Sequence, residues 1–463
     1  MKIITKNEFS QAQKMLSFEE IQTFFEKHYL KNRTIVSKDI PAILEDIEQL
    51  TGLPLLRHRF ASGEDHGTWI IPPRWDVKEA WLKDCKGRTV ASYADHPLFV
   101  CPYSKAVHQK LSKAELLPHV SFEPKQPGAF AYNWRYANHA KMRLKEWGIS
   151  LPKNIIDKLD DGPFEIFIDT EVEDGEMIVG EIVLPGKSSE AIIFVADYCH
   201  PGQVNDSFSG LGMFMKVMNT LAHKSRRHFT YRFLVLPETI GSAAYIAQDP
   251  SRVKNVVGTI FADSVAWGGQ WYIKLSRQGN TLMDVLAVDC QMSFKDVELC
   301  QFSGALKNGE VIFNNDEIIF DSVQVNIPSL SVQKYPFDEY HTSNDTPDRV
   351  KESELAFAHD LVMHMADILE KDAVYRFTHP VPFWMSRFDL YSDALQDYQQ
   401  YRFKFDIVYR YLDGKRSILE IAQLLNVPFK AVFDFIKKME QNDLVKVIQA
   451  NPWRSFNPKG SAC

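Results

Sequence analysis

The sequence contains no long hydrophobic run and few cysteines. None of its 463 residues lies in a stretch apolar enough to span a bilayer, and residues 1–15 lack the apolar core of a signal peptide. The six cysteines form no CxxC pair, so we expect reduced thiols that mostly serve packing. Together these absences predict a cytoplasmic protein without membrane contact.

The sequence also lacks a basic excess. Its 53 Lys and Arg residues stand against 60 Asp and Glu residues, and the net charge of −7 argues against nucleic-acid binding by the whole protein. There is no internal repeat or low-complexity tract. A hydrophobic content of 45% and an aromatic content of 12% exclude global disorder. The length suits two or three domains with large packed cores.

An alternation of strand and helix signals fills residues 191–370. Apolar runs predict strands, and longer periodic segments predict helices. The expected strands are 191–196, 231–236, 256–262 and 329–333, with shorter ones at 271–274 and 311–313, and the expected helices are 212–223, 242–247 and 353–371. This alternation is typical of an α/β fold with a mostly parallel sheet and helices on both of its faces.

The chain on either side of this region has a different texture. Residues 61–185 carry short alternating runs with turn signals, which predict a β-rich insert with one helix at 133–147. Residues 403–448 predict three short helices and a closing strand, the pattern of a winged helix-turn-helix. The predicted domains are N-terminal helices over 1–60 that belong to the α/β domain, the β-rich insert over 61–185, the α/β domain over 186–385 and a winged helix over 395–455.

Acidic and histidine residues follow the predicted core strands. His200 and Asp206 follow the first of the four main strands, Glu238 follows the second, Asp263 the third and His341 the fourth. The carboxyl ends of parallel strands meet at one edge of a sheet, where open α/β sheets bind their ligands, so we expect these five side chains to face one crevice. Two imidazoles and three carboxylates suit one zinc ion, or two that share a bridging carboxylate.

Each of these residues also has a purely structural explanation. Asp206 suits the N-cap of the next helix, Glu238 suits a helix N-terminus, and Asp263 suits a turn. His341 lies in a loop before a predicted helix start and needs no further role. The metal site is the better interpretation because all five residues converge on one edge of the sheet.

A cysteine and a pair of histidines elsewhere in the sequence are weaker candidates for a chemical role. Cys199 is a candidate catalytic thiol, but side chains alternate along an extended segment, so it should point away from the site if His200 points into it. His359 and His364 lie five residues apart on one predicted helix, where their side chains diverge by about 140° and cannot hold one metal.

Several motifs along the chain resemble those of known bacterial proteins. They are IIPPRW at 70–75, His200 with NDSFSG at 205–210, ETIGS at 238–242, Asp263, NDE at 315–317, IPS at 327–329 and YHTSNDT at 340–346. Together they resemble the bacterial "aminopeptidase-like domain" proteins, which are often associated with polysaccharide-biosynthesis clusters. More distantly, their order resembles the zinc-dependent aminopeptidases of the bacterial leucyl aminopeptidase type. The resemblance covers nearly the whole chain.

The resemblance implies an architecture and a set of roles. The architecture is a three-layer, mostly parallel sheet of zinc-aminopeptidase type with an inserted β-rich domain and a C-terminal winged helix. Asp206 would bridge two zinc ions. His200 and Asp263 would bind one ion, and Glu238 and His341 the other. The substrate would be a small peptide or another small amide.

Two positions depart from the aminopeptidase pattern. Pro237 stands where those enzymes have the first Glu of a Glu-Glu pair, which is their general base. Gly202 stands where they have the Asp that orients the first histidine. Either Glu238 is the catalytic base of a single-zinc site, or another acid such as Glu339 replaces the missing one, or the site binds without hydrolysing.

The sequence therefore predicts a zinc-dependent hydrolase of amide bonds, in which a carboxylate carries the proton. Two alternatives stay open: an amidase or deacylase of a sugar or aminoacyl conjugate, and a non-catalytic metal-binding or regulatory protein. DNA is an unexpected partner because the predicted recognition helix, 429–438, has only three lysines among its phenylalanines. Packing, or assembly into a homo-oligomer, suits this winged helix better.

Overall fold

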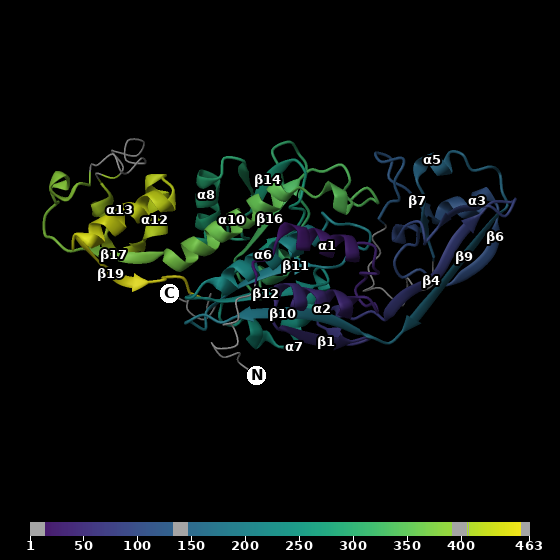
Figure 1. Ribbon diagram of the computed structural model, residues 1–463, viewed down its shortest axis with the longest axis horizontal. Coiled ribbons are helices and arrows are strands. Elements are labelled where there is room, and N and C mark those ends of the chain that lie inside the picture. The colour runs from purple at the N-terminus through teal and green to yellow at the C-terminus, as the bar shows by residue number, and fades with distance from the viewer. Residues whose placement is uncertain (1–13, 133–146, 391–404, 406, 455–463) are drawn as a thin grey trace.

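The computed structural model describes residues 14–132, 147–390, 405 and 407–454. The helix expected at 133–147 therefore lies almost wholly outside the described residues. Figure 1 shows an elongated molecule with a central sheet, a smaller β-rich part at one end and a small C-terminal unit at the other. Within the described part of the chain, no helix is both long and apolar enough to cross a membrane.

An eight-stranded mixed sheet forms the centre of the molecule. Its strands lie in the order β1 (Leu55–Ala61), β10 (Glu176–Leu184), β12 (Thr230–Leu236), β11 (Ala191–Asp197), β13 (Val256–Ala262), β16 (Ser329–Tyr335), β14 (Gln270–Lys274) and β15 (Val297–Cys300). The adjacent strands β12, β11, β13 and β16 are parallel. β11 and β13 are buried along their whole length, as expected of parallel strands covered on both faces. The predicted α/β fold with a mostly parallel sheet is confirmed.

Two details of the sheets differ from the expectation. β10 falls within the range predicted for the insert, but it pairs with β1 and β12 in the central sheet. Residues 311–313 form no strand, and Val311 makes only an isolated bridge with Ala305. The reason is the same in both cases, because an apolar run shows that a segment can pair but not which strand is available to it.

Helices cover both faces of the central sheet, as predicted. One face packs against α1 (Phe18–His28), α2 (Ile40–Thr51), α6 (Phe208–His223), α8 (Leu282–Ser293) and α10 (Glu352–Lys371), and the other against α7 (Ile240–Gln248) and the short α9 (Glu317–Phe320). Each face has its own hydrophobic core. The result is a three-layer arrangement that leaves the carboxyl ends of the parallel strands at one edge.

The chain between β1 and β10 builds a second, smaller sheet. Its antiparallel strands have the order β5 (Thr89–Ser92), β4 (Arg74–Lys83), β9 (Phe164–Glu173) and β6 (Val107–Leu111). Trp75, Leu82 and Ile166 belong to a core of its own. The short elements of this region are β2 (Asp65–His66), β3 (Trp69–Ile70), α3 (Lys113–Leu116), β7 (Val120–Ser121), β8 (Ile149–Ser150) and α5 (Lys153–Ile156). The boundaries of the insert as a domain stay a prediction.

The C-terminal unit combines a three-stranded sheet with two helices. Its strands have the order β18 (Asp413–Ser417), β17 (Ala373–Phe377) and β19 (Val445–Ala450), and its helices are α12 (Ile418–Leu425) and α13 (Phe429–Gln441). Within the described residues, a 3₁₀ turn at Val408–Tyr411 directly precedes β18. β17 lies before this unit's helices in the sequence and supplies the pairing edge for β18. The winged-helix assignment stays a prediction.

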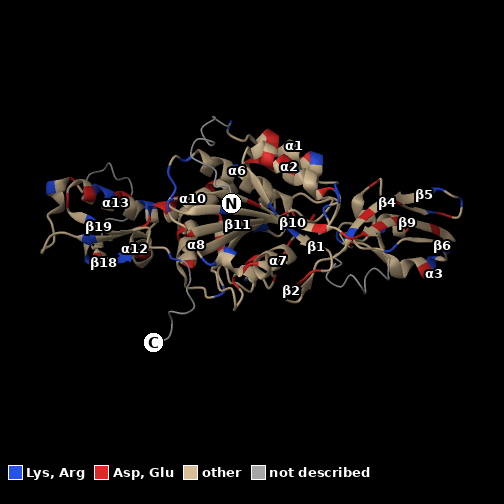
Figure 2. Cartoon of the chain, turned by 90° about the horizontal axis from the view of Figure 1, so that it is seen from below, with Lys and Arg blue, Asp and Glu red and all other residues tan. Residues whose placement is uncertain are grey.

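The lysines of α13 each face an acidic residue. Lys430 pairs with Asp434, Lys437 with Glu440 and Lys438 with Asp389. Figure 2 shows acidic and basic residues interspersed along the elements of the C-terminal unit. That this unit does not bind DNA stays a prediction, and the pairing favours it because phosphate binding needs available cations.

Candidate metal centre

A cavity of about 450 Å³ opens at the carboxyl ends of the parallel strands. Its lining includes all five residues that the sequence singles out, namely His200, Asp206, Glu238, Asp263 and His341. The first two follow β11, and the others follow β12, β13 and β16 in turn. The parallel sheet thus brings together side chains that are far apart in the sequence, at the edge where such sheets bind ligands.

Asp206 lies between the two histidines of the cavity. Its Oδ2 atom is 3.0 Å from Nε2 of His341, and its Oδ1 atom is 3.9 Å from Nδ1 of His200. One ligand atom from each of the three residues lies within 4.8 Å of the other two. One cation can therefore contact all three residues.

Glu238 approaches the same cluster from the end of β12. Its Oε2 atom is 3.5 Å from Nε2 of His200. Asn315, with its amide nitrogen turned toward Glu238, donates to Oε1 at 2.9 Å. The loop of Asn315 is itself fixed by the fully buried Lys274, whose ammonium donates to Oε1 of Glu317 at 2.7 Å. The side chain of Glu238 is thus fixed by Asn315, whose loop is in turn held by Lys274.

Asp197 is a further acid of the cavity, beyond the five residues predicted as ligands. It is the last residue of β11, and its side chain is buried in the cavity lining. Its Oδ1 atom has no hydrogen-bond partner among the described residues, and the same is true of Oδ1 of Asp263. An acid that ends an apolar strand is the signal that points to it. A buried oxygen without a hydrogen-bond donor costs free energy, so a cation in the cavity would stabilise these carboxylates.

Cys199 is absent from the lining of this cavity, although its side chain still reaches the ring of His200. Its Sγ atom lies 3.4 Å from Nδ1 of His200. The alternation of side chains holds only for extended backbone, and His200 has a φ of 75°, which turns the chain at this point. Burial raises the pKa of the Cys199 thiol well above its usual value, and Asp197 adds to this effect, so the metal-free residue is a poor nucleophile.

The carboxylates of the cavity repel one another. Burial, reinforced by neighbouring acids, raises the pKa of Glu238, Asp263 and Asp197 well above their usual values. Asp206 differs, because the two histidines outweigh the effect of its burial and hold its pKa below the usual value. Burial lowers the pKa of His200 to about 4, so its imidazole is neutral near pH 7 and offers a lone pair.

This donor set fits a zinc-type cation. Neutral imidazoles and carboxylates are zinc ligands, and buried carboxylate oxygens without donors surround the histidines. A divalent cation would relieve the repulsion among the acids, because a nearby opposite charge favours the ionised carboxylate. The assignment of individual residues to one ion or to two stays a prediction.

The loops that carry the site share an unusual backbone conformation. Positive φ angles occur at His200 (75°), Thr239 (58°), Ser264 (53°) and His341 (56°). Each of these residues is, or directly follows, one of the five candidate residues. Residues other than glycine seldom adopt this conformation, which costs about 1–3 kcal/mol and clusters at functional sites. The strain at this one edge supports a functional role for the loops.

The β-rich part of the chain contributes an aromatic side to the site. The ring centroid of Tyr132 is 5.1 Å from that of His200 and 5.0 Å from that of His341. The backbone N–H of Tyr132 donates to the carbonyl of His341 at 2.7 Å. Tyr340 stacks on His341 with a centroid distance of 3.9 Å. These contacts orient the imidazoles, and no local sequence signal points to Tyr132.

The departures from the aminopeptidase pattern have structural consequences. Gly202 has a φ of 75°, and a Cβ atom there would lie 2.5 Å from Cε1 of His96, so an aspartate does not fit unless His96 moves. Glu339, the other candidate base, pairs with Arg349 at 2.7 Å and accepts the indole N–H of Trp267 at 3.2 Å. Glu339 is therefore engaged elsewhere, which leaves the acids of the cavity itself.

Two buried charged residues fix the loop that carries His200 and Asp206. Arg33 donates to four backbone carbonyls, those of Tyr198, Cys199, His200 and Gln203. Asp345 accepts three backbone N–H groups, those of Val204, Asn205 and Asp206. Both residues come from distant parts of the sequence, so the position of the candidate ligands depends on long-range contacts.

Replacing Arg33 with alanine is expected to lower stability and metal affinity together. The carbonyls that it binds would lose their donors, and each unsatisfied buried group costs about 1–3 kcal/mol. We expect the free energy of unfolding in urea to fall by at least ~3 kcal/mol. Zinc affinity should fall by about 10–100-fold, as is usual for residues that support metal ligands.

The control for this change is Arg59→Ala. Arg59 is half exposed, and its pair with Glu176 should contribute less than about 1 kcal/mol. Zinc affinity should be unchanged in this variant, since Arg59 lies on the edge strand β1 and is paired with Glu176 rather than with the loop of His200 and Asp206. Equal effects of the two substitutions on zinc binding would contradict the role assigned to Arg33.

The fold is that of an aminopeptidase-like protein. A crystal structure described as a "putative peptidase" from Clostridium acetobutylicum matches with a TM-score of 0.81 and 26% identity, over 93% of this chain and 96% of that one. A zinc aminopeptidase from Bacillus subtilis matches with a TM-score of 0.52 and 13% identity, over 77% of this chain and 96% of that one. The second likeness shows the shared fold.

Within this class, the chain belongs to the family described as "Domain of unknown function (DUF4910)", whose model matches residues 22–372. It is also 26% identical, over 435 residues, to a C. acetobutylicum protein named "Putative polysaccharide biosynthesis protein with aminopeptidase-like domain". That similarity covers 93% of this chain and 96% of the relative. The resemblance to aminopeptidase-like proteins that the sequence motifs indicate is confirmed.

Proposed function

We propose that this protein is a zinc-dependent hydrolase of amide bonds. The observation that carries the proposal is the convergence of His200, Asp206 and His341, together with further buried carboxylates, on one cavity. The description of the B. subtilis neighbour as a zinc aminopeptidase favours zinc as the metal. The peptidase description of the C. acetobutylicum structure favours an amide as the bond that is cleaved.

The cavity residues divide into those that hold the metal and those that handle protons. His200, Asp206 and His341 would hold zinc, with Asp263 at the same ion or at a second one. When bound, zinc supplies a Lewis acid for the carbonyl and lowers the pKa of water. Glu238 would accept the proton of the attacking water and deliver it to the leaving amine.

Several contacts keep these residues in place for the reaction. Asn315 holds one oxygen of Glu238, which leaves the other directed toward His200. Tyr132 and Tyr340 pack against the imidazole rings and limit their rotation. A site held in this way orients the reacting groups before the substrate binds, which is a large part of what an enzyme contributes to rate.

The cavity suits a small substrate that has an apolar part and does not depend on a carboxylate for binding. Its volume lies within the range of about 300–1,000 Å³ that is usual for small-molecule sites. Trp69, Phe313 and Phe337 give it aromatic walls. Among the described residues of its lining, the cationic side chain is Lys334, and this is paired with Glu354 at 2.8 Å. A substrate carboxylate would therefore find no unpaired cationic side chain among these described residues.

The proposal is tested with zinc-loaded protein and a panel of amides. The panel contains aminoacyl anilides, short peptides and N-acetylated amino sugars. We expect cleavage of at least one member, slow cleavage of the anilides because Pro237 replaces the usual general base, and loss of all cleavage with a chelator until zinc is restored. Protein shown to contain zinc that cleaves no member of the panel would refute the hydrolase proposal.

A further inference from the structure

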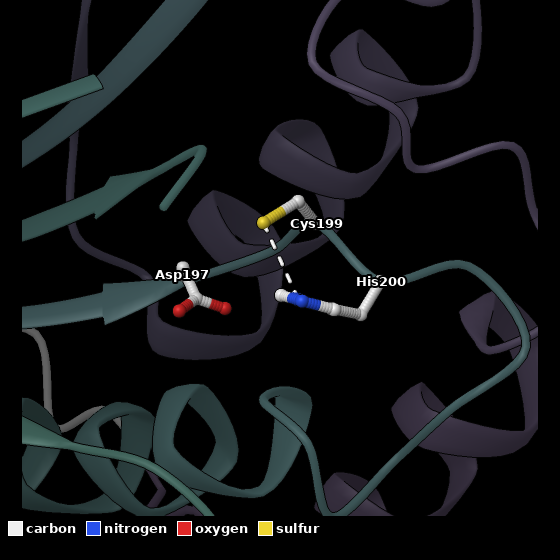
Figure 3. Close-up of side chains that lie close together, drawn as sticks. All are labelled: Asp197, Cys199 and His200. Atoms are coloured by element: carbon white, nitrogen blue, oxygen red, sulfur yellow. Dashed lines mark hydrogen bonds between the residues drawn. The ribbon is translucent and has the colours of Figure 1, made fainter. Parts of the chain in front are cut away.

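Asp197, Cys199 and His200 meet at the end of β11 (Figure 3). One ligand atom from each residue lies within 4.8 Å of the other two. Sγ of Cys199 is 3.4 Å from Nδ1 of His200, and the carboxylate of Asp197 faces the same imidazole ring (Figure 3). This cluster shares His200 with the Asp206–His341 group but adds a sulfur atom, which that group lacks.

The surroundings of these side chains resemble those of a metal ligand set. Asp197 is 1% exposed, and its Oδ1 atom has no hydrogen-bond partner within the described part of the chain. The backbone N–H of Glu238 donates to Sγ of Cys199 at 3.3 Å, a contact that stabilises negative charge on a sulfur ligand. A cysteine with only a packing role does not account for a buried, unpartnered carboxylate beside it.

We propose that Asp197 and Cys199 join His200 in binding a divalent cation, so that the cation at His200 has a sulfur ligand. Thiolate, imidazole and carboxylate form a donor set that suits zinc and is poorly suited to magnesium or manganese. A thiol binds as the thiolate, so the proton of Cys199 passes to solvent when the cation enters, and no electron is transferred. The proposal rests on the metal centre of the proposed function but not on hydrolysis.

The test replaces zinc with cobalt, whose absorption reports its ligands. Metal-free full-length protein is titrated with Co²⁺ while the near-ultraviolet and visible spectra are recorded. We expect a thiolate-to-cobalt charge-transfer band in the near ultraviolet for the wild type. Cys199→Ser should lose this band while it still binds cobalt through the histidines. Zinc should displace the cobalt, and an excess of magnesium should not.

Cys300→Ser is the matched control, because Cys300 is also buried but lies on β15 and belongs to neither group of candidate metal ligands. Its charge-transfer band should equal that of the wild type. A second variant, Asp197→Asn, removes the carboxylate charge and keeps the sulfur. It should weaken cobalt binding about tenfold or more and keep the band.

The outcomes separate this proposal from the proposed function. Cobalt binding by the wild type without a thiolate band, or a band that persists in Cys199→Ser, would overturn the sulfur ligand and leave the hydrolase proposal standing. Unchanged cobalt affinity in Asp197→Asn would overturn the assignment of Asp197 as a ligand and would likewise leave the hydrolase proposal standing. Failure of the wild type to bind either cobalt or zinc would overturn the metal centre, and both proposals with it.

Discussion

The His341→Ala protein is expected to retain almost none of the zinc that the wild type binds. Nε2 of His341 lies 3.0 Å from Asp206, so the substitution removes a ligand and also a contact that keeps Asp206 ionised. Zinc affinity should fall by more than the factor of about 10–100 that is typical when a residue hydrogen-bonded to a metal ligand is removed. Metal analysis after dialysis measures this directly.

A thermal titration gives a second reading of the same change. A ligand present at 100 times its dissociation constant stabilises the folded state by about 2.7 kcal/mol, so added zinc should raise the melting temperature of the wild type and leave that of His341→Ala unchanged. His359→Ala is the control, because His359 bonds Thr220 and Asp360 outside the cavity. If His341→Ala kept full zinc stoichiometry, His341 would not be a ligand and the metal centre would need another composition.

Much of the central fold is predictable because local patterns determine it. The strand expected at 256–262 is observed as β13 with the same bounds, and the helix expected at 353–371 is α10, Glu352–Lys371. Strands buried on both faces are continuous apolar runs, and long amphipathic helices keep one period over many residues. Pairing is less predictable, as β10 and the C-terminal unit show, because a strand's partner is chosen by distant parts of the chain.

The candidate site, like the fold, is predictable where local sequence determines it and unpredictable where long-range contacts do. His200, Asp206 and the other candidate residues all follow the carboxyl ends of parallel strands, so their position in the sequence predicts that they line one cavity. The residues that hold them in place cannot be predicted in this way, because Arg33, Tyr132 and Lys274 act through contacts with distant segments. No periodicity or spacing within the sequence encodes such contacts.

The Glu238→Gln protein is expected to keep its zinc and to lose most of its activity. Glutamine has the shape of glutamate, and its amide oxygen can still accept the hydrogen bond from Asn315, so the geometry of the cavity should survive. The amide cannot take a proton from water, and general base catalysis typically contributes about 10²–10⁴-fold to the rate. We expect kcat to fall within that range on the amide that the wild type cleaves best. Glu298→Gln, a change at a half-exposed side chain on the edge strand β15, should leave kcat unchanged.

Zinc content decides which role Glu238 has. If Glu238 is only the proton acceptor, Glu238→Gln keeps zinc stoichiometry near the wild-type value while the rate falls. If Glu238 is a ligand, both the zinc stoichiometry and the rate fall. Pro237 sharpens this test, since it cannot accept a proton in place of its neighbour. Loss of zinc together with rate would make Glu238 a ligand and move proton transfer to another acid of the cavity. Activity that survives in Glu238→Gln at full zinc content would show that Glu238 has neither role.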